Sequence, residues 1–237
     1  MNGRFHALLV AWLVVLAAHG QGSFQNLGFE SAVIVPIPGD LYARVQFSEA
    51  LPGWTGYVGG VQQSAAHHNN MFLDSSGIAI IGAGWPYGGR IQGAFTVALQ
   101  AGLDLGTLAV TDTSLAQTGL IPSSTQTLRF RAKQGGGLFG SGPGDLIVSV
   151  DGQILSLSPL GSGPNYMSYG ADIHSWAGQT VEVRFTATGV TPHVGNNNWF
   201  LDSIAFSDQA VPEPGVFTLF GLGALFFMSR LFNKSRA

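Results

Sequence analysis

The stretch Thr127-Leu-Arg-Phe-Arg-Ala-Lys133 alternates polar and apolar residues, and its apolar members are Leu128, Phe130 and Ala132. Successive side chains of a β-strand point to opposite faces, so this period of two predicts a strand with one face on a core and the other in water. A second stretch, Thr180-Val-Glu-Val-Arg-Phe-Thr186, repeats the pattern. Together the two stretches predict sheet structure with one buried face.

Further strand signals lie on both sides of these stretches, and no long segment of the body holds a helical period. Asp151-Gly152 is a two-residue signal for a tight turn between two strands, and one helical turn is predicted over 172–177. The other predicted strands cover residues 78–81, 90–99, 145–151, 153–157 and 199–206. Many short strands broken by glycines predict an all-β fold, an antiparallel β-sandwich of the jelly-roll type.

The composition narrows the function classes. Charged residues make up only 10% of the 237 residues, against about 25% in an average protein, and the length suits one domain with appendages. The absence of cysteine excludes thiol catalysis and cysteine metal sites, and neither supports nor excludes export. Between the two end segments, six basic residues stand against twelve acidic ones without a basic stripe, so nucleic acid is not an expected partner.

The N-terminal segment has the pattern of a secretory signal peptide over residues 1–20. Arg4 supplies the positive start, and residues 7–18 are an unbroken apolar run of suitable length. Small residues follow, so cleavage by signal peptidase fits after Ala18 or after Gly20. The alternative is a short amphipathic or buried helix. A cleaved signal predicts that the protein is exported.

The C-terminal segment combines a Pro-Glu-Pro signature, an apolar run over residues 215–229 and a basic end. The residues of the signature and of the basic end are Val211, Pro212, Glu213, Pro214, Arg230, Lys234 and Arg236. The apolar run is short against the roughly 20 residues of a comfortable transmembrane helix, which suits a temporary hold. The positive end is expected to stay cytoplasmic while the preceding domain lies outside.

In this order the three features resemble the PEP-CTERM family of sorting tails. The resemblance covers residues 211–237 and implies processing near the signature by a membrane-embedded, exosortase-like enzyme. It also implies a Gram-negative bacterium, in which a C-terminal helix anchors the protein transiently in the inner membrane before it reaches the cell surface or extracellular matrix. The alternative is an ordinary C-terminal anchor, which changes the processing but keeps the export topology.

The chain is thus predicted to have four parts. Residues 1–20 form the signal peptide, and residues 21–207 form the β-sandwich domain. Residues 208–214 form a linker with the Pro-Glu-Pro signature, and residues 215–237 form the transmembrane segment and basic tail. A glycine-rich run at 135–144 is predicted to be a loop within the sandwich, because similar strands flank it.

Five short segments of the body follow one another in a recognisable order. They are FQNLGFE (24–30), LPGW (51–54), YGADI (169–173), AGQTVEVRF (177–185) and LDSI (201–204). Their order resembles that of carbohydrate-binding-module-like jelly rolls of the galactose-binding-like superfamily. The resemblance implies the fold. Sugar binding does not follow from it, because function depends on sites that differ among proteins of one fold.

The body offers little for catalysis. Its glutamates are Glu30, Glu49 and Glu182. A glycosidase needs two carboxylates on either side of one bond, but Glu182 alternates with core residues beside Arg184 and is expected to face water. Asp74 remains without an obvious partner. The sequence also lacks a Gly-x-Ser-x-Gly elbow, a His-Glu-x-x-His motif and a phosphate-binding loop, so we do not expect an enzyme.

Two segments raise the question of a metal site. His67 and His68 are adjacent and point to opposite faces of any strand, so they predict a polar loop rather than a ligand set. In the superfamily that the body resembles, the first and last strands often meet at a structural calcium ion held by carboxylate and backbone oxygens. The resemblance places that ion at Glu30, at the close of the first strand, and Asp202, with Asp40 as a further contributor. The alternative is that Asp202 hydrogen-bonds a strand end.

The segment GAGWPYGG (82–89) holds Trp85 and Tyr87 in a loop that can approach a ligand. Sugars stack on exposed aromatic rings, so the two residues are candidate ligand-binding residues. The alternative is that both rings fold back as a lid on the sandwich. The other tryptophans, Trp54, Trp176 and Trp199, lie beside strand patterns and are expected to pack in the core or at sheet ends.

The leading prediction is a non-catalytic exported surface or extracellular-matrix protein that requires no cofactor. One alternative is a glycan-binding module on the same β-sandwich, with extracellular polysaccharide as its partner. Another is a glycoside hydrolase whose site no motif reveals. Exposure of Trp85 and Tyr87 along a shallow groove favours the glycan-binding module, and a converging pair of acids favours the hydrolase.

Overall fold

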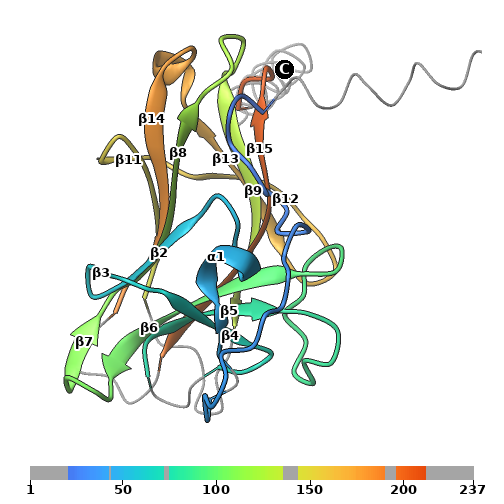
Figure 1. Cartoon of the computed structure of the whole chain (residues 1–237). Helices are drawn as coiled ribbons and strands as arrows, with labels where there is room; N and C mark the ends of the chain where they lie inside the picture. Colours follow the sequence, from blue (N-terminus) through green and yellow to red (C-terminus); the bar gives the residue numbers. More distant parts are fainter. Residues whose placement is uncertain (1–20, 43, 72–74, 136–143, 190–195, 212–237) are drawn as a thin grey trace, which may run out of the picture.

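The alternating strands pair into two sheets in the computed structural model of the chain (Figure 1). The structure describes residues 21–42, 44–71, 75–135, 144–189 and 196–211. The predicted signal peptide and transmembrane segment, most of the sorting signature, Asp74 and most of the glycine-rich run lie outside these residues.

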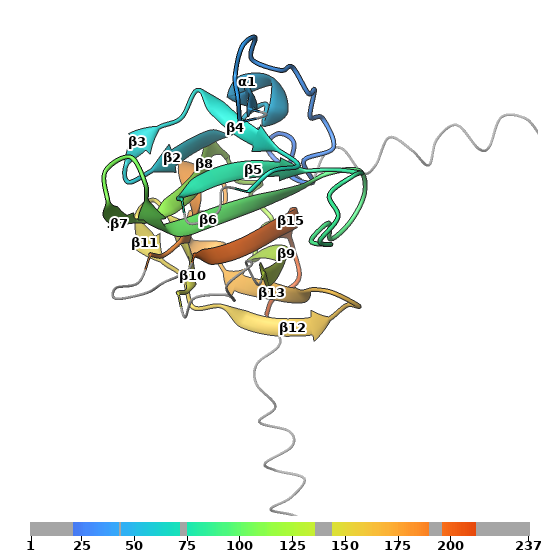
Figure 2. The same ribbon diagram turned by 90° about the horizontal axis from the view of Figure 1, so that it is seen from below.

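The larger sheet has nine strands within the described residues, and β7 (Ala109–Thr111) pairs only with β6. Figure 2 shows most of them following one another across the sheet. Their order is β1 (Arg44–Gln46), β4 (Ala65–His68), β5 (Gly77–Ile81), β6 (Thr96–Asp104), β15 (Asn197–Ser207), β9 (Thr127–Gly135), β13 (Met167–Asp172) and β12 (Ser158–Ser162). β15 is thus a central strand, although it comes last in the chain.

The second sheet has six described strands. Their order is β11 (Gln153–Ile154), β10 (Leu146–Val150), β14 (Thr180–Ala187), β8 (Thr113–Leu120), β2 (Thr55–Val58) and β3 (Val61–Gln62). Helical structure is confined to α1 (Phe47–Ala50) and the 3-10 turn η2 (His174–Trp176) in the described ranges. The all-β sandwich is therefore confirmed, and so is the helical turn within 172–177.

The inner faces of β9 and β14 form the centre of the core. Phe130 of β9 and Phe185 of β14 are fully buried, with ring centroids 5.2 Å apart and edge to face. Trp54 lies edge-on to Phe185 at 6.3 Å. These contacts confirm the prediction that both stretches form strands with one face in the core. They also confirm the core position of Trp54, while Trp176 and Trp199 pack partly buried against the same cluster.

Three local expectations were wrong. The pairing is not wholly antiparallel, because β4 and β5 pair in parallel at His67↔Ala79 and His68↔Ile80. This pairing also places the two histidines in a strand rather than a polar loop. Residues 24–30 form turns instead of a first strand, since Phe29 takes a positive φ of 61° and its N–H bonds back to the carbonyl of Asn26.

The strand predicted over 90–99 begins only at Thr96. The residues before Thr96 do not extend the strand, because their backbone N–H groups have side-chain acceptors. The backbone N–H groups of Gln92, Ala94 and Phe95 donate to carboxylates rather than to a neighbouring strand. Residues 82–95 are therefore a loop that side chains from other segments anchor.

The core contact predicts a large effect of truncating Phe185. Phe185→Ala should lower the free energy of unfolding of the fragment 21–210 by about 3–5 kcal/mol, because it removes a fully buried ring and leaves a cavity. Urea unfolding followed by circular dichroism measures the loss. Thr118→Ala, on the exposed side of the neighbouring strand β8, is the matched control and should change stability by less than about 0.5 kcal/mol. A loss below about 1 kcal/mol for Phe185→Ala would contradict this assignment of the core.

Candidate functional site

The loop of residues 82–95, between β5 and β6, packs on the outer face of the larger sheet (Figure 1, right). Ala79 and Ile81 alternate with the core residues of β5, and with Ala98 and Phe200 they form a second apolar cluster. A Cβ atom at Gly89 would lie 2.5 Å from the Phe200 ring. Only a glycine lets the loop backbone come this close to the sheet.

The structure separates the two loop aromatics. Trp85 is half-buried and packs on the second apolar cluster, as the lid alternative requires. Tyr87 is 72% exposed, with its ring edge-on to Trp85 at 5.2 Å. The indole Nε1 of Trp85 is buried and has no hydrogen-bond partner. Trp85 thus serves as a base for Tyr87, and ligand binding by the pair stays a prediction.

Glu30 and Asp202 both bind the end of this loop. The Glu30 carboxylate accepts hydrogen bonds from the N–H groups of Ala94, at 2.8 Å, and Phe95, at 3.4 Å. The Asp202 carboxylate accepts from the Gln92 N–H at 3.1 Å and the Thr96 hydroxyl at 2.6 Å. The two carboxylates therefore reach the same segment, 92–96, from the opening turn and from the last strand.

Asp202 is 1% exposed, and burial raises the pKa of its carboxyl above the ordinary value, although hydrogen bonds from Thr96, Gln92 and Ser203 oppose the shift. A buried carboxylate is stabilised by a nearby cation, which fits the predicted calcium ion. The oxygens, however, already hold N–H and O–H donors, and no cluster of three or more acidic, histidine or cysteine ligands occurs among the described residues. Asp40, the further contributor, bonds Arg44 instead. The calcium site stays a prediction.

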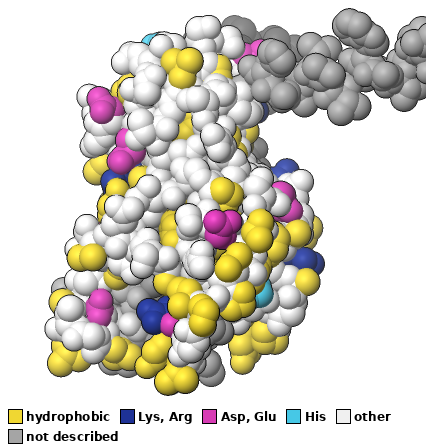
Figure 3. All heavy atoms as spheres, viewed as in Figure 1, with side chains coloured by type: hydrophobic (Ala, Val, Ile, Leu, Met, Phe, Trp, Pro, Cys, Tyr) yellow, Lys and Arg dark blue, Asp and Glu magenta, His cyan; other side chains and the backbone are white. Residues whose placement is uncertain are grey.

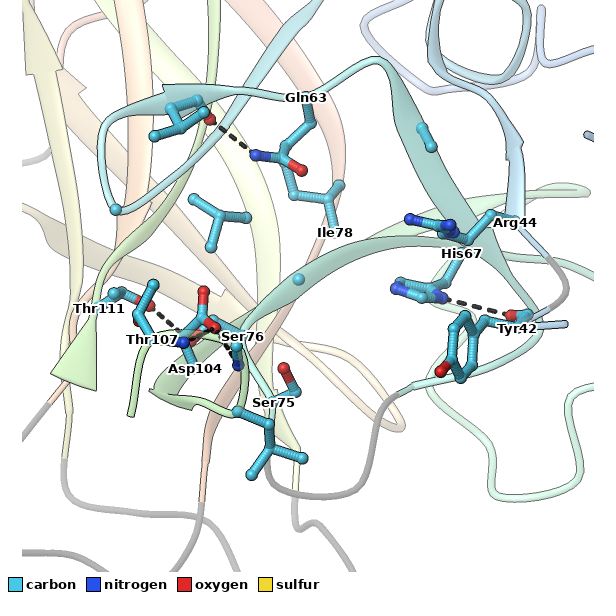
Figure 4. Close-up of a pocket in the computed structure, with 17 residues that line it drawn as sticks. Tyr42, Arg44, Gln63, His67, Ser75, Ser76, Ile78, Asp104, Thr107 and Thr111 are labelled. Carbon is cyan, nitrogen blue, oxygen red and sulfur yellow. Dashed lines mark hydrogen bonds between the residues drawn. The ribbon is translucent and has the colours of Figure 1, made fainter. Parts of the chain in front are cut away.

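A separate pocket of about 580 Å³ opens between β4, β5 and the turn that joins β6 to β7 (Figure 4). Its polar side chains include Arg44, His67, Ser76 and Thr111, and its apolar ones include Ile78. The Thr111 hydroxyl donates to the Ser76 hydroxyl at 2.7 Å, and the latter donates to the Gly102 carbonyl at 2.9 Å. The pocket mixes hydroxyls, one cation and apolar wall, which suits a small polar ligand.

The titratable groups of the pocket do not form an acid–base pair. Asp104 holds its own turn by accepting from the N–H groups of Gly106 and Thr107. Burial lowers the pKa of His67 below its ordinary value, so the imidazole is neutral at pH 7. Arg44 pairs with Asp40 and, by its hydrogen bond, lowers the pKa of that carboxyl to about 2. These groups can position a ligand, and their geometry does not indicate a proton transfer.

Exposed apolar side chains surround this end of the molecule. Figure 3 shows hydrophobic side chains gathered along its lower margin, and β7 lies at the lower left in Figure 1. Tyr42 (49% exposed), Val61 (65%) and Leu105 (49%) also line the pocket. The sequence offered no signal for this pocket, because its lining comes from several separate segments that only the fold brings together.

The expected absence of a basic stripe was wrong. Arg129, Arg131 and Lys133 alternate with core residues of β9, so all three lie on the outer face of that strand. The same alternation that predicts the strand could have identified them. The position predicted for Glu182 on the strand is confirmed, since it lies beside Arg184 and pairs with it at 2.8 Å.

The sorting signature begins at Val211, the last described residue before the C-terminal segment. A family model for the PEP-CTERM protein-sorting motif matches residues 210–234. The chain carries a PEP-CTERM sorting motif. The motif implies an exported protein that an exosortase sorts to the cell surface or the extracellular space. None of the helices in the described ranges has the length and apolar character that a membrane crossing needs.

Comparisons of the whole chain add little. No curated protein sequence matches it. The secreted serine protease VesC from Vibrio cholerae is similar at 13% identity and a TM-score of 0.32, over 59% of this chain and 26% of VesC. The carbohydrate-binding module TmCBM61, in complex with β-1,4-galactotriose, is similar at 12% identity and a TM-score of 0.38, over 80% of this chain and 99% of the module. Tailspike protein 4 of bacteriophage CBA120 is similar at 13% identity and a TM-score of 0.36, over 68% of this chain and 20% of the tailspike chain. The chain thus spans about a quarter of VesC. At these TM-scores the similarities support no functional argument.

The calcium prediction can be tested on the fragment 21–210. If calcium binds only the folded state, free calcium should raise the melting temperature over that in chelator, by mass action. Asp202→Asn should abolish the difference, and Asp208→Asn, at an exposed position of the same chain end, should keep it. Thermal melts followed by circular dichroism measure both. If the wild-type fragment melts at the same temperature with calcium and with chelator, Glu30 and Asp202 are loop anchors without an ion.

Proposed function

We propose that this chain is a non-catalytic surface or extracellular-matrix protein that is held briefly in the inner membrane and then processed. The observation that carries the proposal is the sorting motif at residues 210–234, which directly follows a sandwich whose last strand ends at Ser207. A sorting motif of this kind acts on a protein that crosses the membrane. The sandwich is then the part of the chain that acts outside.

The topology follows from the two ends. The signal peptide at 1–20 starts translocation, and the apolar run 215–229 stops it. Arg230, Lys234 and Arg236 stay on the cytoplasmic side, because positive residues next to a span resist transfer. The short run holds the chain only weakly, so cleavage near the Pro-Glu-Pro signature by an exosortase-like enzyme releases the domain.

The glutamates of the body support a non-catalytic role. Glu30 binds loop N–H groups, and Glu182 forms an ion pair with Arg184. Glu49 is exposed in the first turn of α1. Each of the three therefore has a structural or surface position of its own.

The sorting proposal predicts a processing defect. In a Gram-negative strain that has an exosortase, the full chain should be exported and shortened, whereas Glu213→Ala should remain unprocessed in the membrane fraction. Cell fractionation and immunoblotting detect the two forms. Asp208→Ala, outside the matched signature, is the control and should be processed like the wild type. Equal processing of Glu213→Ala and wild type, or a cytoplasmic full-length product, would contradict the proposal.

A second candidate function is glycan binding by the loop of residues 82–95. It is favoured by the 72% exposure of Tyr87 and by its support on the half-buried Trp85. An exposed ring fixed edge-on by another ring loses little conformational entropy when a sugar stacks on it. The pocket at Tyr42 and Arg44 is the competing location on the same sandwich.

A glycan array with the fragment 21–210 tests this candidate. If the loop binds, Tyr87→Ala should weaken the affinity for the bound glycan at least about tenfold, as expected for a central aromatic contact. Leu108→Ala, which removes an equally exposed apolar side chain, should leave the affinity unchanged. If only Tyr42→Ala abolishes glycan binding, the binding site is the pocket and not the loop. If the fragment binds no glycan on the array, the candidate function is contradicted. Release of reducing sugar would instead contradict the non-catalytic role.

A further inference from the structure

The basic residues of the body fall into two groups. The described residues hold six basic and eleven acidic side chains. Arg44 pairs with Asp40, and Arg184 pairs with Glu182. The other four form no ion pair within the described ranges: Arg90, Arg129, Arg131 and Lys133. All of the uncompensated positive charge of the described sandwich therefore belongs to these four residues.

Three of the four lie in one row. Arg129, Arg131 and Lys133 occupy alternate positions of β9 on the outer face, and each is half-buried. Outward side chains on a strand repeat about every 6.7 Å, so the row is about 13 Å long. We call these three residues the basic row.

The neighbours of the basic row on the outer face include one carboxylate, that of Asp202 on β15 opposite Arg131, which is buried and accepts from the Gln92 N–H and the Thr96 hydroxyl. Ser168 and Gly170 of β13 lie opposite Arg131 and Arg129, and Ala205 of β15 lies on the other side of Arg129. Their short side chains do not reach over the row. The Arg129 guanidinium donates to the Thr127 hydroxyl at 3.2 Å and to the Gln209 carbonyl at 3.3 Å, and no carboxylate of the described residues forms an ion pair with any of the three cations.

One aromatic ring contacts Arg131, the middle residue of the basic row. The guanidinium of Arg131 lies 4.8 Å from the centre of the Tyr166 ring, a cation–π contact. Tyr166 belongs to the turn between β12 and β13, and its neighbour Asn165 donates a hydrogen bond to the Arg90 carbonyl at 2.9 Å. This bond ties the turn to the loop that carries Arg90. The fourth unpaired cation therefore borders the same surface.

We propose that the basic row and Tyr166 bind an acidic polysaccharide, one whose sugar rings carry carboxylates. Guanidinium groups pair with carboxylates through two parallel hydrogen bonds. The Tyr166 ring holds the Arg131 guanidinium in place through the cation–π contact. The inference rests on the proposed export, which brings the sandwich into contact with extracellular polysaccharide, and it names the partner of the surface or matrix protein.

The charge of the remaining surface selects a sparsely charged polymer. The described residues include eleven acidic side chains, of which Asp40 and Glu182 pair with the other two cations. Nucleic acid carries one charge about every 1.7 Å of duplex, and its binding needs many neutralised phosphates. An acidic polysaccharide has uncharged ring atoms between its carboxylates. Three cations can therefore pair with its carboxylates while fewer of its negative charges lie next to the acidic surface.

The experiment measures binding of the fragment 21–210 to polygalacturonate by isothermal titration calorimetry at low salt. The triple variant Arg129→Gln, Arg131→Gln and Lys133→Gln should raise Kd at least about tenfold, and added salt should weaken wild-type binding. The control variant Arg184→Gln removes a cation that is paired with Glu182 and should change Kd by less than about threefold. Methyl-esterified polygalacturonate, which has the same rings without the charges, should not bind.

Several outcomes would overturn the inference: equal Kd for wild type and triple variant, equal binding of the esterified polymer, or tighter binding to duplex DNA or to phosphatidylglycerol vesicles. If the triple variant does not fold, Lys133→Gln alone should still raise Kd at least about threefold. If Tyr87→Ala abolishes binding and the triple variant keeps it, the glycan lies on the loop and the basic row is not its site. The measurement needs neither export nor processing, so a failure of sorting leaves this result unaffected.

Discussion

The face-to-face contact of β9 with β14 is the constraint on which the other features depend. Phe130 stacks on Tyr169 of its own sheet, with centroids 5.5 Å apart, and meets Phe185 of the opposite sheet edge-on. Trp54 continues the chain of rings from Phe185 to Phe29 of the opening turns. Because apolar burial stabilises at roughly 25 cal/mol per Å² and these rings are large, this contact orients both sheets. The outer faces of the same strands are then determined as well, since strand side chains alternate.

The outer face of the larger sheet shows the consequence. The loop of residues 82–95 covers it above Phe200, and two carboxylates from distant segments hold the end of that loop. A carboxylate that accepts backbone N–H groups replaces the hydrogen bonds that a neighbouring strand would make. Glu30 and Asp202 therefore decide where β6 begins.

The chain has few charged residues, so the position of each one has a large effect on the charge pattern of the surface. Two of the six described cations are neutralised locally, and the others collect on one sheet face and its bordering loop. No carboxylate of the described residues forms an ion pair with these groups. Where they lie then determines which polymers can approach, which is a statement about partners rather than about the fold.

The period-two alternation, the Asp-Gly turn and the terminal signals are local, so the sequence by itself determined the all-β class, most strands and the sorting motif. The basic row was also encoded locally, because Arg129, Arg131 and Lys133 alternate with Leu128, Phe130 and Ala132. Whether these cations stay unpaired depends on the ion pairs that form elsewhere. Tertiary structure alone decided the parallel pairing of β4 with β5, the late start of β6 and the pocket at Arg44 and His67. Each of these depends on hydrogen bonds or packing between residues far apart in the chain, such as Glu30 with Ala94. Local propensity carries no information about such partners, because it reports only what a segment prefers alone.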